Sequence, residues 1–418
     1  MHLLAITLAT LILIGLAVQS WQSFHLARLF KNYAPVELKK QLLPRCAVVL
    51  CLRGCDPGLK ERIEMLIDQE YPDFHVYLII DHESDPSVEV VNEIASRRKP
   101  VHLTVRFIDA HPLDCSLVAN NHGTVLPELA ADYPVLALVD ADAATWPTWL
   151  RTLVTPLVNS TEIGLVSGNR WYMPMVPTFA SIIRMIWNYG SVQQMVFFKY
   201  PWGGSLAMKS EIAAAPQFAQ QLKKSFGNDT LMYSLARSAG FQVAFHPGMM
   251  LVNKEQIRLS DFFSWMVRQI LYARLYHPSW PALLGTGVAT STVIGLSIAS
   301  NVVSLIAGDW ASFCILTSTL MIFLGVWIGF LFHLDRTVAG MVSPRGEPQR
   351  WWSVATAIKI FLIAPLVQFV FLAGLYRAAV TRKVNWRGIE YEIDGPFNVR
   401  MLEYRPYGEK RAANESIL

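Results

Sequence analysis

The chain has 418 residues, of which 53% are hydrophobic and 16% charged, and its 36 Lys and Arg against 32 Asp and Glu give a net charge of +4. An ordinary soluble domain carries about 25% charged residues, so part of this chain is expected to lie in lipid. High apolar content with low net charge excludes a disordered chain, and the small basic surplus forms no dense stripe, which argues against a nucleic-acid partner.

The chain begins with an uncharged apolar run. Residues 3–18 read LLAITLATLILIGLAV, and at about 1.5 Å per residue this run, completed by the next three residues, spans a bilayer. A cleaved signal peptide is the alternative, but it needs a basic start and a small-residue cleavage site. The start here is Met1-His2 and no convincing cleavage site follows. We therefore expect a retained transmembrane anchor over residues 1–21.

Basic residues decide which side of the membrane the following domain occupies. Arg28, Lys31, Lys39 and Lys40 come directly after the anchor, and Lys and Arg favour the cytoplasmic side. The five cysteines are odd in number and match no zinc-site spacing, which predicts reduced thiols in a reducing compartment. We expect an integral protein of the bacterial inner membrane, or an equivalent membrane, with its globular domain in the cytoplasm.

Short apolar runs alternate with helical patterns over residues 22–255. The apolar runs predict strands over residues 46–52, 76–80, 101–108, 135–139 and 163–167. Helical spacing occurs over residues 59–68, 87–96 and 118–129, and Pro147 opens a further helix. This alternation predicts an α/β domain with a mostly parallel sheet. Such sheets bind ligands beyond the carboxyl ends of their strands.

Aspartates stand where two of the predicted strands end. Asp81 directly follows VYLII, Asp140 directly follows VLALV, and Asp142 comes two residues later. Paired carboxylates suit a hard divalent cation, Mg²⁺ or Mn²⁺, which neutralises charge on a departing diphosphate. A loop cap is the alternative role for such an Asp-x-Asp pair, although its position after an apolar strand favours the ligand site.

Asp229 follows the turn formed by residues 226–228, and a helix is expected to begin near it. A carboxylate directed into the crevice could act as general base and take a proton from an acceptor hydroxyl. The alternative is that Asp229 or Asn228 only caps the helix.

Residues 256–280 combine an apolar stripe with three arginines and predict an amphipathic helix that lies in the membrane interface. Arg268, in the middle of this segment, could contact the diphosphate or orient the acceptor site. The alternative is that Arg268 extends its side chain to lipid headgroups.

Three further apolar runs are long enough to span a bilayer. They cover residues 281–307, 311–332 and 353–376, and a tail of residues 377–418 follows. With the anchor they predict four crossings. The basic tail then conflicts with the charge rule, because four crossings place it outside. One run could instead be interfacial or re-entrant, and the polar 281–307 run is the weakest candidate for a crossing.

Together these features resemble the membrane glycosyltransferases of the GT-A fold, families 2 and 21, and most of all the ceramide glucosyltransferases and their bacterial relatives. That family has a nucleotide-site aspartate, a D-x-D-like element, a later aspartate base and a (Q/R)-x-x-R-W motif. Here the order is Asp81, Asp140 with Asp142, Asp229 and Arg268. The likeness extends to LRGCDPGLKERIEMLIDQEYPDFHVYLIIDHESDP, GLVSGNRWYMP and VNWRGIEYEIDG, and it covers nearly the whole chain.

Two elements depart from the family pattern. The (Q/R)-x-x-R-W motif reads Trp265-Met-Val-Arg268-Gln269, so only the arginine is kept. The acidic pair that commonly precedes the base reads Asn228-Asp229. These changes are compatible with a different acceptor or with weakened activity.

The resemblance implies a mechanism of inverting displacement with a UDP-sugar as donor. Asp81 is expected to bind uridine, Asp142 with help from Asp140 to hold the cation on the diphosphate, and Asp229 to deprotonate the hydroxyl of a membrane lipid. Gly203 and Gly204 either allow the backbone to approach the sugar closely or form a plain turn. The aromatic stretch 171–200 either admits the lipid or packs as ordinary core.

The expected reaction is transfer of a hexose, taken here as glucose, with galactose and N-acetylglucosamine as open alternatives. The acceptor is a lipid such as ceramide, diacylglycerol or a hopanoid. Two other functions remain: a processive polysaccharide synthase, which would need more membrane helices and a complete Q-x-x-R-W motif, and a non-catalytic protein that binds nucleotide sugars.

Overall fold

The computed structural model describes residues 1–34, 38–347 and 353–408, and within these ranges a seven-stranded mixed sheet forms the centre of the large domain, in the order β3-β2-β1-β4-β6-β5-β7. Its strands are β1 Cys46–Leu52, β2 Phe74–Ile80, β3 Leu103–Phe107, β4 Val135–Val139, β5 Ile163–Tyr172, β6 Ser205–Lys209 and β7 Gln242–Asn253. Strands β1 to β4 run parallel, whereas β6 is antiparallel to β4 and β5. The predicted α/β class with a mostly parallel sheet is confirmed.

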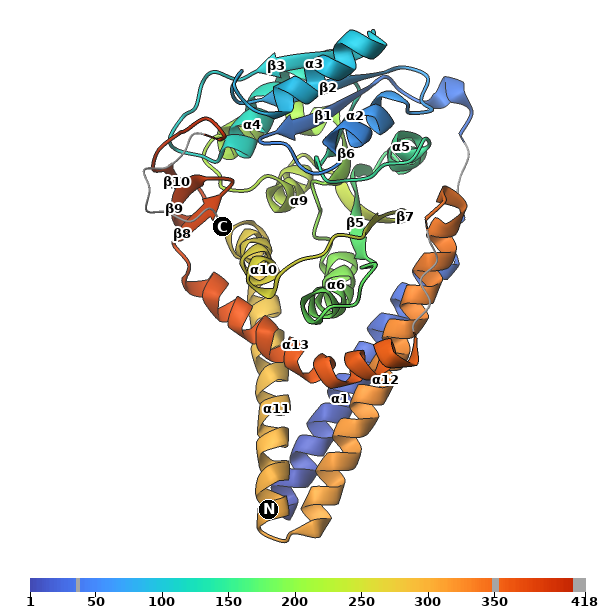
Figure 1. The fold of residues 1–418 in the computed structure, drawn as a ribbon, viewed down its shortest axis with the longest axis vertical. Coiled ribbons are helices and arrows are strands. Elements are labelled where there is room, and N and C mark those ends of the chain that lie inside the picture. Colours follow the sequence, from blue (N-terminus) through green and yellow to red (C-terminus); the bar gives the residue numbers. More distant parts are fainter. Residues whose placement is uncertain (35–37, 348–352, 409–418) are drawn as a thin grey trace.

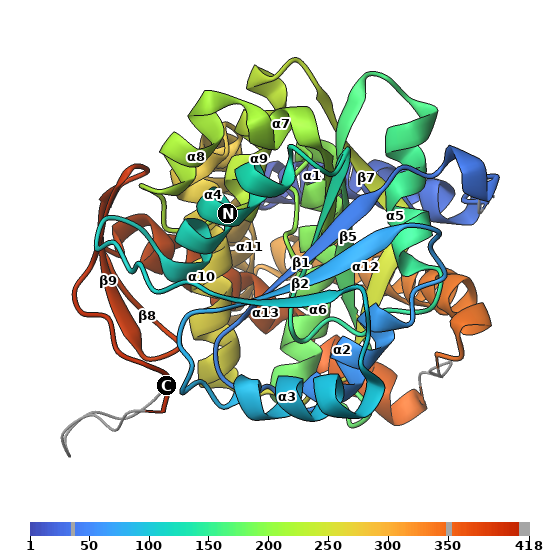
Figure 2. The ribbon, with the colours of Figure 1, turned by 90° about the horizontal axis from the view of Figure 1, so that it is seen from above.

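Helices cover both faces of this sheet, which explains the near-continuous apolar strands. One face carries α2 Leu59–Ile67, α3 Ser87–Arg98 and α5 Trp149–Asn159. The other carries α4 Leu117–Leu129, α7 Ser210–Ala214, α8 Pro216–Leu222 and α9 Asp229–Ser238. In β1, Ala47 and Val49 pack into the α4 side while Val48 and Leu50 pack into the α2 side. Figure 2 shows α2 and α3 on one side of the strands and α4 and α8 on the other.

The predicted strands are confirmed where an apolar run is continuous. The expected bounds of β1 and β4 match the structure, and the expected runs 76–80 and 163–167 lie inside the longer strands β2 and β5. Strands β6 and β7 are missing from the sequence prediction. They complete the sheet on the side of β4 that faces away from β1.

The described residues contain four helices that are long and apolar enough to cross a membrane. They are α1 His2–Lys31, α11 Trp280–Ile306, α12 Trp310–Val342 and α13 Val354–Val380. Helices α1, α11 and α12 pack on one another and extend away from the sheet domain, with the N-terminus at the far end (Figure 1). Helix α1 continues as one helix past residue 21, the expected end of the anchor.

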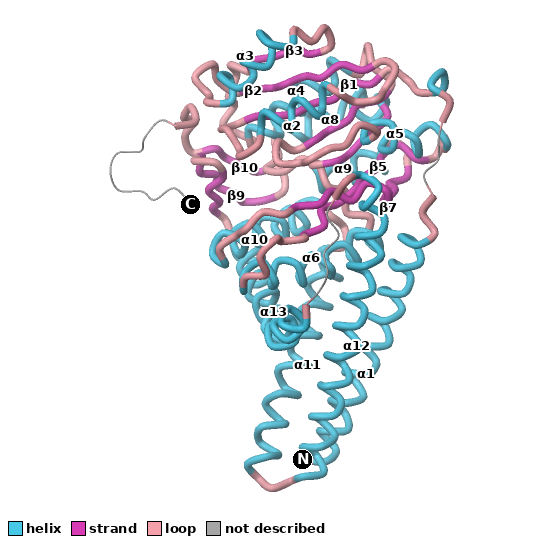
Figure 3. Tube along the Cα trace, turned by 45° about the vertical axis from the view of Figure 1, so that its right-hand side comes forward, coloured by secondary structure: helices cyan, strands magenta, loops and turns pink. Residues whose placement is uncertain are grey.

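Helix α13 is oriented differently from the other three. It runs across the domain end of the bundle in Figure 1, and Figure 3 shows it nearly end-on while α1, α11 and α12 run down the picture. It packs on α6 Phe179–Phe198 and α10 Leu259–Tyr276. A third apolar core, with Phe262, Met266 and Leu334 among its buried members, joins these helices to α1 and α12.

A small antiparallel sheet follows α13. Its strands are β8 Lys383–Trp386, β9 Ile389–Gly395 and β10 Asn398–Met401, and the short helical turns η1 Lys40–Leu42 and η2 Ser343–Arg345 complete the elements. Ile389, Tyr391 and Ile393 are buried in the same core as α9. The small sheet therefore belongs to the main domain, a placement that the sequence did not predict. Residues 409–418 of the expected tail lie outside the described residues.

Candidate active site

Three polar side chains stand at the carboxyl ends of neighbouring strands. Arg53 follows β1, Asp81 follows β2 and Asp140 follows β4. Because β1 pairs in parallel with both β2 and β4, Asp81 and Asp140 lie about two strand spacings, roughly 10 Å, apart at one edge. In open α/β sheets, ligands bind at this edge.

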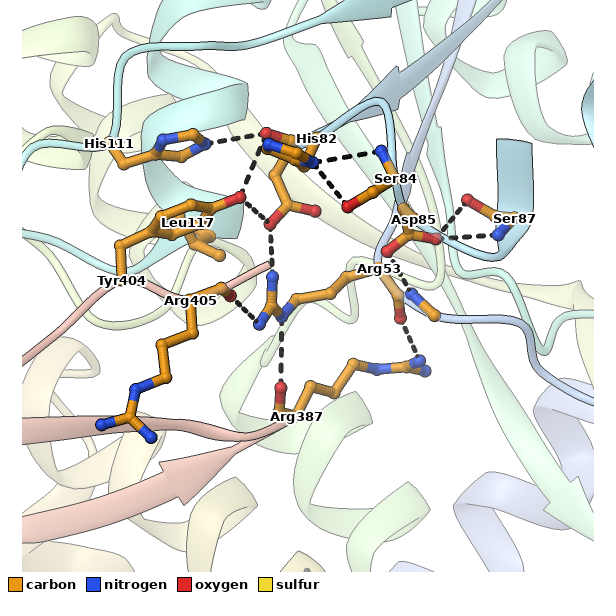
Figure 4. A network of polar contacts seen from close by, with 12 residues as sticks. Arg53, His82, Ser84, Asp85, Ser87, His111, Leu117, Arg387, Tyr404 and Arg405 are labelled. Carbon is orange, nitrogen blue, oxygen red and sulfur yellow. Dashed lines mark hydrogen bonds and ion pairs between the residues drawn. The ribbon is translucent and has the colours of Figure 1, made fainter. Parts of the chain in front are cut away.

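Asp81 is enclosed by residues that the sequence did not single out. Its side chain is 2% exposed and forms an ion pair with Arg53. The hydroxyl of Tyr404, from the segment after β10, lies 3.1 Å from Asp81 Oδ2. His111 Nε2 lies 2.9 Å from the Asp81 carbonyl oxygen (Figure 4). Asp81, the residue expected to bind the nucleotide, thus lies at the carboxyl edge of the sheet and beneath a C-terminal segment.

Asp140 and Asp142 direct their carboxylates at one guanidinium group. Arg170, from β5, donates to both oxygens of Asp142 and to Asp140 Oδ2, the last at 2.8 Å. The ring of Trp202 lies against the same guanidinium, 4.9 Å from its carbon. Arg170 lies within GLVSGNRWYMP, but nothing in the sequence pairs it with these aspartates.

The pKa values of Asp140 and Asp142 are shifted in opposite directions, and Arg170 contributes to this difference. Burial raises the pKa of Asp140, and the negative charges of Asp142 and Asp229 add to this effect while Arg170 opposes it. Burial acts upward on Asp142 as well, but the charge and hydrogen bonds of Arg170 outweigh it and hold the pKa of Asp142 below its ordinary value. Asp142 is therefore the carboxylate more firmly held in its ionised form.

The geometry of this pair fits a hard divalent cation. Two carboxylates that converge on one positive group present the oxygen ligands that Mg²⁺ and Mn²⁺ prefer. No group of three or more His, Cys, Asp or Glu side chains that could hold a metal ion occurs in residues 1–34, 38–347 and 353–408. A cation bound here would therefore depend on Asp140, Asp142 and oxygens of the donor, at the place that Arg170 occupies.

Gly203 and Gly204 let two predicted site residues come together. A Cβ atom on Gly203 would lie 3.1 Å from Asp229 Cβ, and one on Gly204 would collide with Asp140 Oδ2. Adjacent Cα atoms are about 3.8 Å apart, so Asp229 and Asp140 approach neighbouring positions of one loop. The aspartates themselves fill the space beside the glycines, and contact of Gly203 and Gly204 with a sugar stays a prediction.

Asp229 is the first residue of α9, where the sequence places the helix start. Its Oδ1 accepts a hydrogen bond from Thr230 N at 2.7 Å, and its Oδ2 accepts one from Gly203 N at 3.4 Å. Burial raises the pKa of Asp229 and these hydrogen bonds oppose the rise. Asn228, at the N-cap position, makes no side-chain capping bond. A carboxylate with a raised pKa is a stronger proton acceptor than an exposed one.

Arg268 reaches the same region through Tyr272. Burial raises the pKa of the Tyr272 hydroxyl to about 12; the positive charge of Arg268 lowers it, and Asp229 and Asp140 raise it further. The guanidinium carbon of Arg268 lies 6.0 Å from the ring centroid of Trp386 in β8. Its Nε is buried and has no hydrogen-bond partner among the described residues. Arg268 thus lies near Trp386 of the small sheet, one helical turn before Tyr272.

A cavity of about 610 Å³ extends from Asp229 and Arg170 to the long helices. Its wall is built by residues of α1, α6, α10, α11, α12 and α13. Trp265 and Gln269, the two altered positions of the motif around Arg268, both lie on this wall. The expected aromatic stretch 171–200 supplies part of it through α6. Arg170 and Asp229 therefore face a largely apolar cavity.

The fold that carries this cluster is similar to the fold of solved glycosyltransferase structures. Among solved structures, the mannosyltransferase PcManGT from Pyrobaculum calidifontis, in complex with GDP-Man and Mn²⁺, resembles this chain with a TM-score of 0.50 at 16% identity, covering 91% of this chain and 97% of that one. At this identity the likeness shows the GT-A fold.

Two further structures are similar at lower scores. Glucosyl-3-phosphoglycerate synthase from Mycobacterium tuberculosis, in complex with Mn²⁺, UDP and phosphoglyceric acid, has a TM-score of 0.36 at 13% identity, covering 58% of this chain and 83% of that one. S. aureus TarS in complex with UDP-GlcNAc has a TM-score of 0.35 at 11% identity, covering 86% of this chain and 100% of that one.

A model of the family described as glycosyl transferase family 21 matches residues 7–396. The match covers most of α1, the sheet domain, the other long helices and most of the small sheet. It confirms the family resemblance, and with it a glycosyltransferase that uses a nucleotide-sugar donor. The chain belongs to glycosyltransferase family 21.

Proposed function

We propose that this chain transfers a hexose, taken first as glucose, from a UDP-sugar to the hydroxyl of a neutral membrane lipid, with inversion at the anomeric carbon. The observation that carries the proposal is the cavity, because it joins Asp229 to helices that are apolar enough to lie in a bilayer. A soluble acceptor would have no need of such a passage. Cavities of a few hundred Å³ bury most of a small ligand.

The chemistry of the cavity wall favours a neutral acceptor. Arg170 and Asp229 are the charged residues among the described lining residues, and Arg170 is already paired with two carboxylates. A lipid phosphate would need unpaired cationic groups. The wall is instead rich in carboxamides, namely Gln19, Gln22, Asn169, Asn188, Gln193, Gln194, Gln269 and Gln368. Oε1 of Gln194 is buried and has no hydrogen-bond partner among the described residues, so it is available to a hydroxyl or amide donor.

The proposed step moves one proton and exchanges one bond. The acceptor hydroxyl gives its proton to Asp229 while its oxygen attacks the anomeric carbon, and the bond from that carbon to the diphosphate breaks, so UDP leaves with the bonding electrons. Asp229 suits this role because it lines the cavity and lies beside Asp140. Attack from the face opposite the leaving group inverts the configuration.

The diphosphate needs positive charge nearby. Asp140 and Asp142 would hold Mg²⁺ or Mn²⁺, and a bound cation would neutralise charge on the diphosphate. The Mn²⁺ in the Pyrobaculum mannosyltransferase complex supports this choice. Arg170 neutralises the charge of the same two carboxylates before the donor binds. Arg268, half-buried beside Trp386, orients the acceptor side of the site.

Filling the cavity should stop transfer without harming the donor site. Gly190 lies on the cavity wall, and no atom lies within 4 Å of a Cβ added there. We expect Gly190→Leu to reduce transfer to lipid at least about tenfold, because the new side chain enters the space of the acceptor. Glycine is a poor helix former, so leucine in α6 should not destabilise the fold. Lipid product is measured by mass spectrometry, and UDP binding by calorimetry.

Gly325 offers a matched control for Gly190. It also has no atom within 4 Å of an added Cβ, but it lies on α12 away from the described cavity wall. Gly325→Leu should leave transfer unchanged. Equal transfer by Gly190→Leu and the unaltered chain would remove the cavity from the acceptor route.

We also propose three membrane crossings, with α13 lying in the interface. Ile389 and Tyr391, after α13, are buried in the core of the sheet domain, and Arg345, before it, donates to the Met250 carbonyl of β7 at 2.9 Å. Both flanks of α13 are thus held by one domain. The exposed apolar residues of α13 follow one another at spacings of three, four or seven positions, which places them on one face of the helix. They are Val354, Ile358, Leu362, Leu366, Phe369, Tyr376 and Val380. Such a stripe fits a helix with one face in lipid, and three crossings remove the conflict over the basic tail.

Cysteine labelling distinguishes three crossings from four. In a chain without its native cysteines, Arg382→Cys after α13 should react with an impermeant maleimide from the same side as Arg97→Cys in the sheet domain. Ala307→Cys, at the far end of the bundle, should react from the opposite side. Labelling of Arg382→Cys together with Ala307→Cys would show that α13 crosses the membrane.

A further inference from the structure

The segment after β10 lies over the carboxyl ends of β1, β2 and β3. Tyr404 stacks on His111, which follows β3, with ring centroids 3.6 Å apart and an angle of 8° between the planes. Its hydroxyl lies 3.1 Å from Asp81 Oδ2 and 3.3 Å from the Asp81 carbonyl oxygen. Figure 4 shows the Tyr404 ring alongside His111. An aromatic ring of the chain itself therefore fills the edge of the sheet beside Asp81.

Arg53, which directly follows β1, holds the same segment through hydrogen bonds. Its guanidinium pairs with Asp81, donates from Nη2 to the Arg405 carbonyl at 2.8 Å and donates from Nε to the Arg387 carbonyl at 3.2 Å. Its central carbon lies 5.9 Å from the Tyr404 ring centroid. The side chains of Arg53 and Asp81 are 6% and 2% exposed. A ligand could reach this carboxylate after the segment has moved away.

The surroundings of Tyr404 match what a nucleobase requires. Oδ1 of Asp81 is buried and accepts no hydrogen bond from any described residue. A flat ring that stacks on His111 and points a donor at this carboxylate is what a base with a ring N–H would present. Asp140 lies about 10 Å from Asp81 along the sheet edge. This separation suits a donor whose base lies at Asp81 and whose diphosphate lies at Asp140.

We propose that Tyr404 occupies the nucleobase position of the donor site, so that residues 403–408 compete with the donor nucleotide and move aside when it binds. This inference rests on the proposed function, because it takes the sheet edge as the donor site. The donor replaces the tyrosine on His111 and Asp81, and Arg53 exchanges its bond to the Arg405 carbonyl for a group of the nucleotide.

The chain differs in burial and in regular structure on the two sides of Leu402. In the small sheet, Tyr391, Val399 and Met401 are 0 to 4% exposed, so the sheet is anchored in the core. Beyond Leu402 the described chain forms no helix or strand, and Tyr407 is 36% exposed. Moving residues 403–408 breaks polar contacts and a ring stack and removes Tyr404, which is only partly buried, from the margin of the apolar core. The small sheet stays in place during this motion, as local opening of a short segment requires.

Competition by Tyr404 lowers the apparent affinity for the donor, because only the fraction of chains with the segment displaced can bind. Removal of the ring should therefore tighten binding. We expect the Kd for UDP, measured by calorimetry on the full chain in nanodiscs with Mn²⁺, to fall about three- to tenfold in Tyr404→Ala and by less in Tyr404→Phe. Tyr376→Ala, which removes a tyrosine that is 70% exposed on α13, is the matched control and should leave this Kd unchanged.

Hydrogen exchange of the unaltered chain gives a second readout that needs no variant. Peptides covering residues 402–408 should exchange faster when UDP saturates the site. If Tyr404→Ala binds UDP equally or more weakly and exchange of 402–408 is unchanged or slower with UDP, Tyr404 is a fixed wall and the competition is refuted, while the proposed function stands. If no chain, altered or not, binds UDP, both the competition and the UDP-sugar donor are refuted.

Discussion

Replacement of Asp229 by asparagine is expected to lower kcat about 10²- to 10⁴-fold, the range in which a positioned general base contributes. The amide keeps the shape of the side chain and can still pack beside Gly203, but it cannot take the proton of the acceptor hydroxyl. The donor should still bind, because Asp81, Asp140 and Asp142 are untouched. Lipid glycosylation is measured under single-turnover conditions, and UDP affinity by calorimetry.

The pH dependence of the reaction tests the role of Asp229 independently. Burial raises the pKa of Asp229 above the value of an exposed aspartate. The base form is therefore lost as the pH falls through this raised pKa, and kcat/KM should fall on the acid side at a higher pH than an ordinary aspartate would cause. In Asp229→Asn this acid limb should vanish from the residual activity.

Asn228, next to Asp229, makes no capping bond, and its side-chain amide lies 2.9 Å from His122 Nδ1. Asn228→Ala removes this contact but no carboxylate, so as a neighbouring control it should retain most of the activity. Full transfer by Asp229→Asn, or an unchanged acid limb in that variant, would assign the proton acceptor to another group.

The second large effect is expected at the paired carboxylates. Asp142→Ala removes two of the hydrogen bonds that Arg170 makes and the carboxylate whose pKa is held low. We expect the affinity for UDP in the presence of Mn²⁺ to fall about 100-fold, or about 2.7 kcal/mol. The affinity for UDP should then be the same with Mn²⁺ as with a chelator, because the cation loses a ligand.

Asp132, exposed just before β4, offers a control for the loss of one negative charge near the same strand. Asp132→Ala should bind UDP as the unaltered chain does. Thermal unfolding is measured in parallel, since Arg170 keeps Asp140 as its remaining partner in Asp142→Ala. Unchanged Mn²⁺-dependent binding in Asp142→Ala would refute the cation site at this pair.

The convergence of the aspartates could be predicted because it depends on local pattern. Uninterrupted apolar runs such as VLALV specify buried strands, and a carboxylate directly after such a run must lie at the carboxyl edge. Parallel pairing then brings Asp81 and Asp140 to the same edge. Asp229 joins them through Gly203 and Gly204, which the sequence identified for a different reason, close approach of the backbone to a sugar.

The partners of these aspartates could not be predicted. Arg170 is one of 36 Lys and Arg residues, and its contact with Asp142 depends on how β5 and β6 are inserted beside β4. Tyr404 contacts Asp81 across 323 positions of the chain, a separation at which no spacing rule applies. The stretch VNWRGIEYEIDG was the available signal that the C-terminal region matters, and it contains Tyr391, which is buried in the core.

Composition alone also cannot predict how α13 lies relative to the membrane. Its hydropathy equals that of α1 and α12, so length and apolar content alone predict a crossing. The small sheet after it, packed in the core of the sheet domain, is the observation that favours the proposed position of α13 in the interface. In the sequence, the basic tail conflicts with the four expected crossings, and the polar run at 281–307 is the weakest of them. The proposal assigns the non-crossing role to α13 instead.

The measurement that tests the central claim most directly follows labelled sugar into lipid. The purified full chain in nanodiscs of a neutral hydroxyl lipid and an inert phospholipid is supplied with UDP-[¹⁴C]hexose and Mn²⁺. UDP release is compared with the hexose attached per lipid molecule. We predict one UDP released for each labelled lipid, a single hexose on each product, and no product from Asp229→Asn. Label found only as free sugar, or in long glycan chains, would contradict transfer to a lipid hydroxyl at the edge of this sheet.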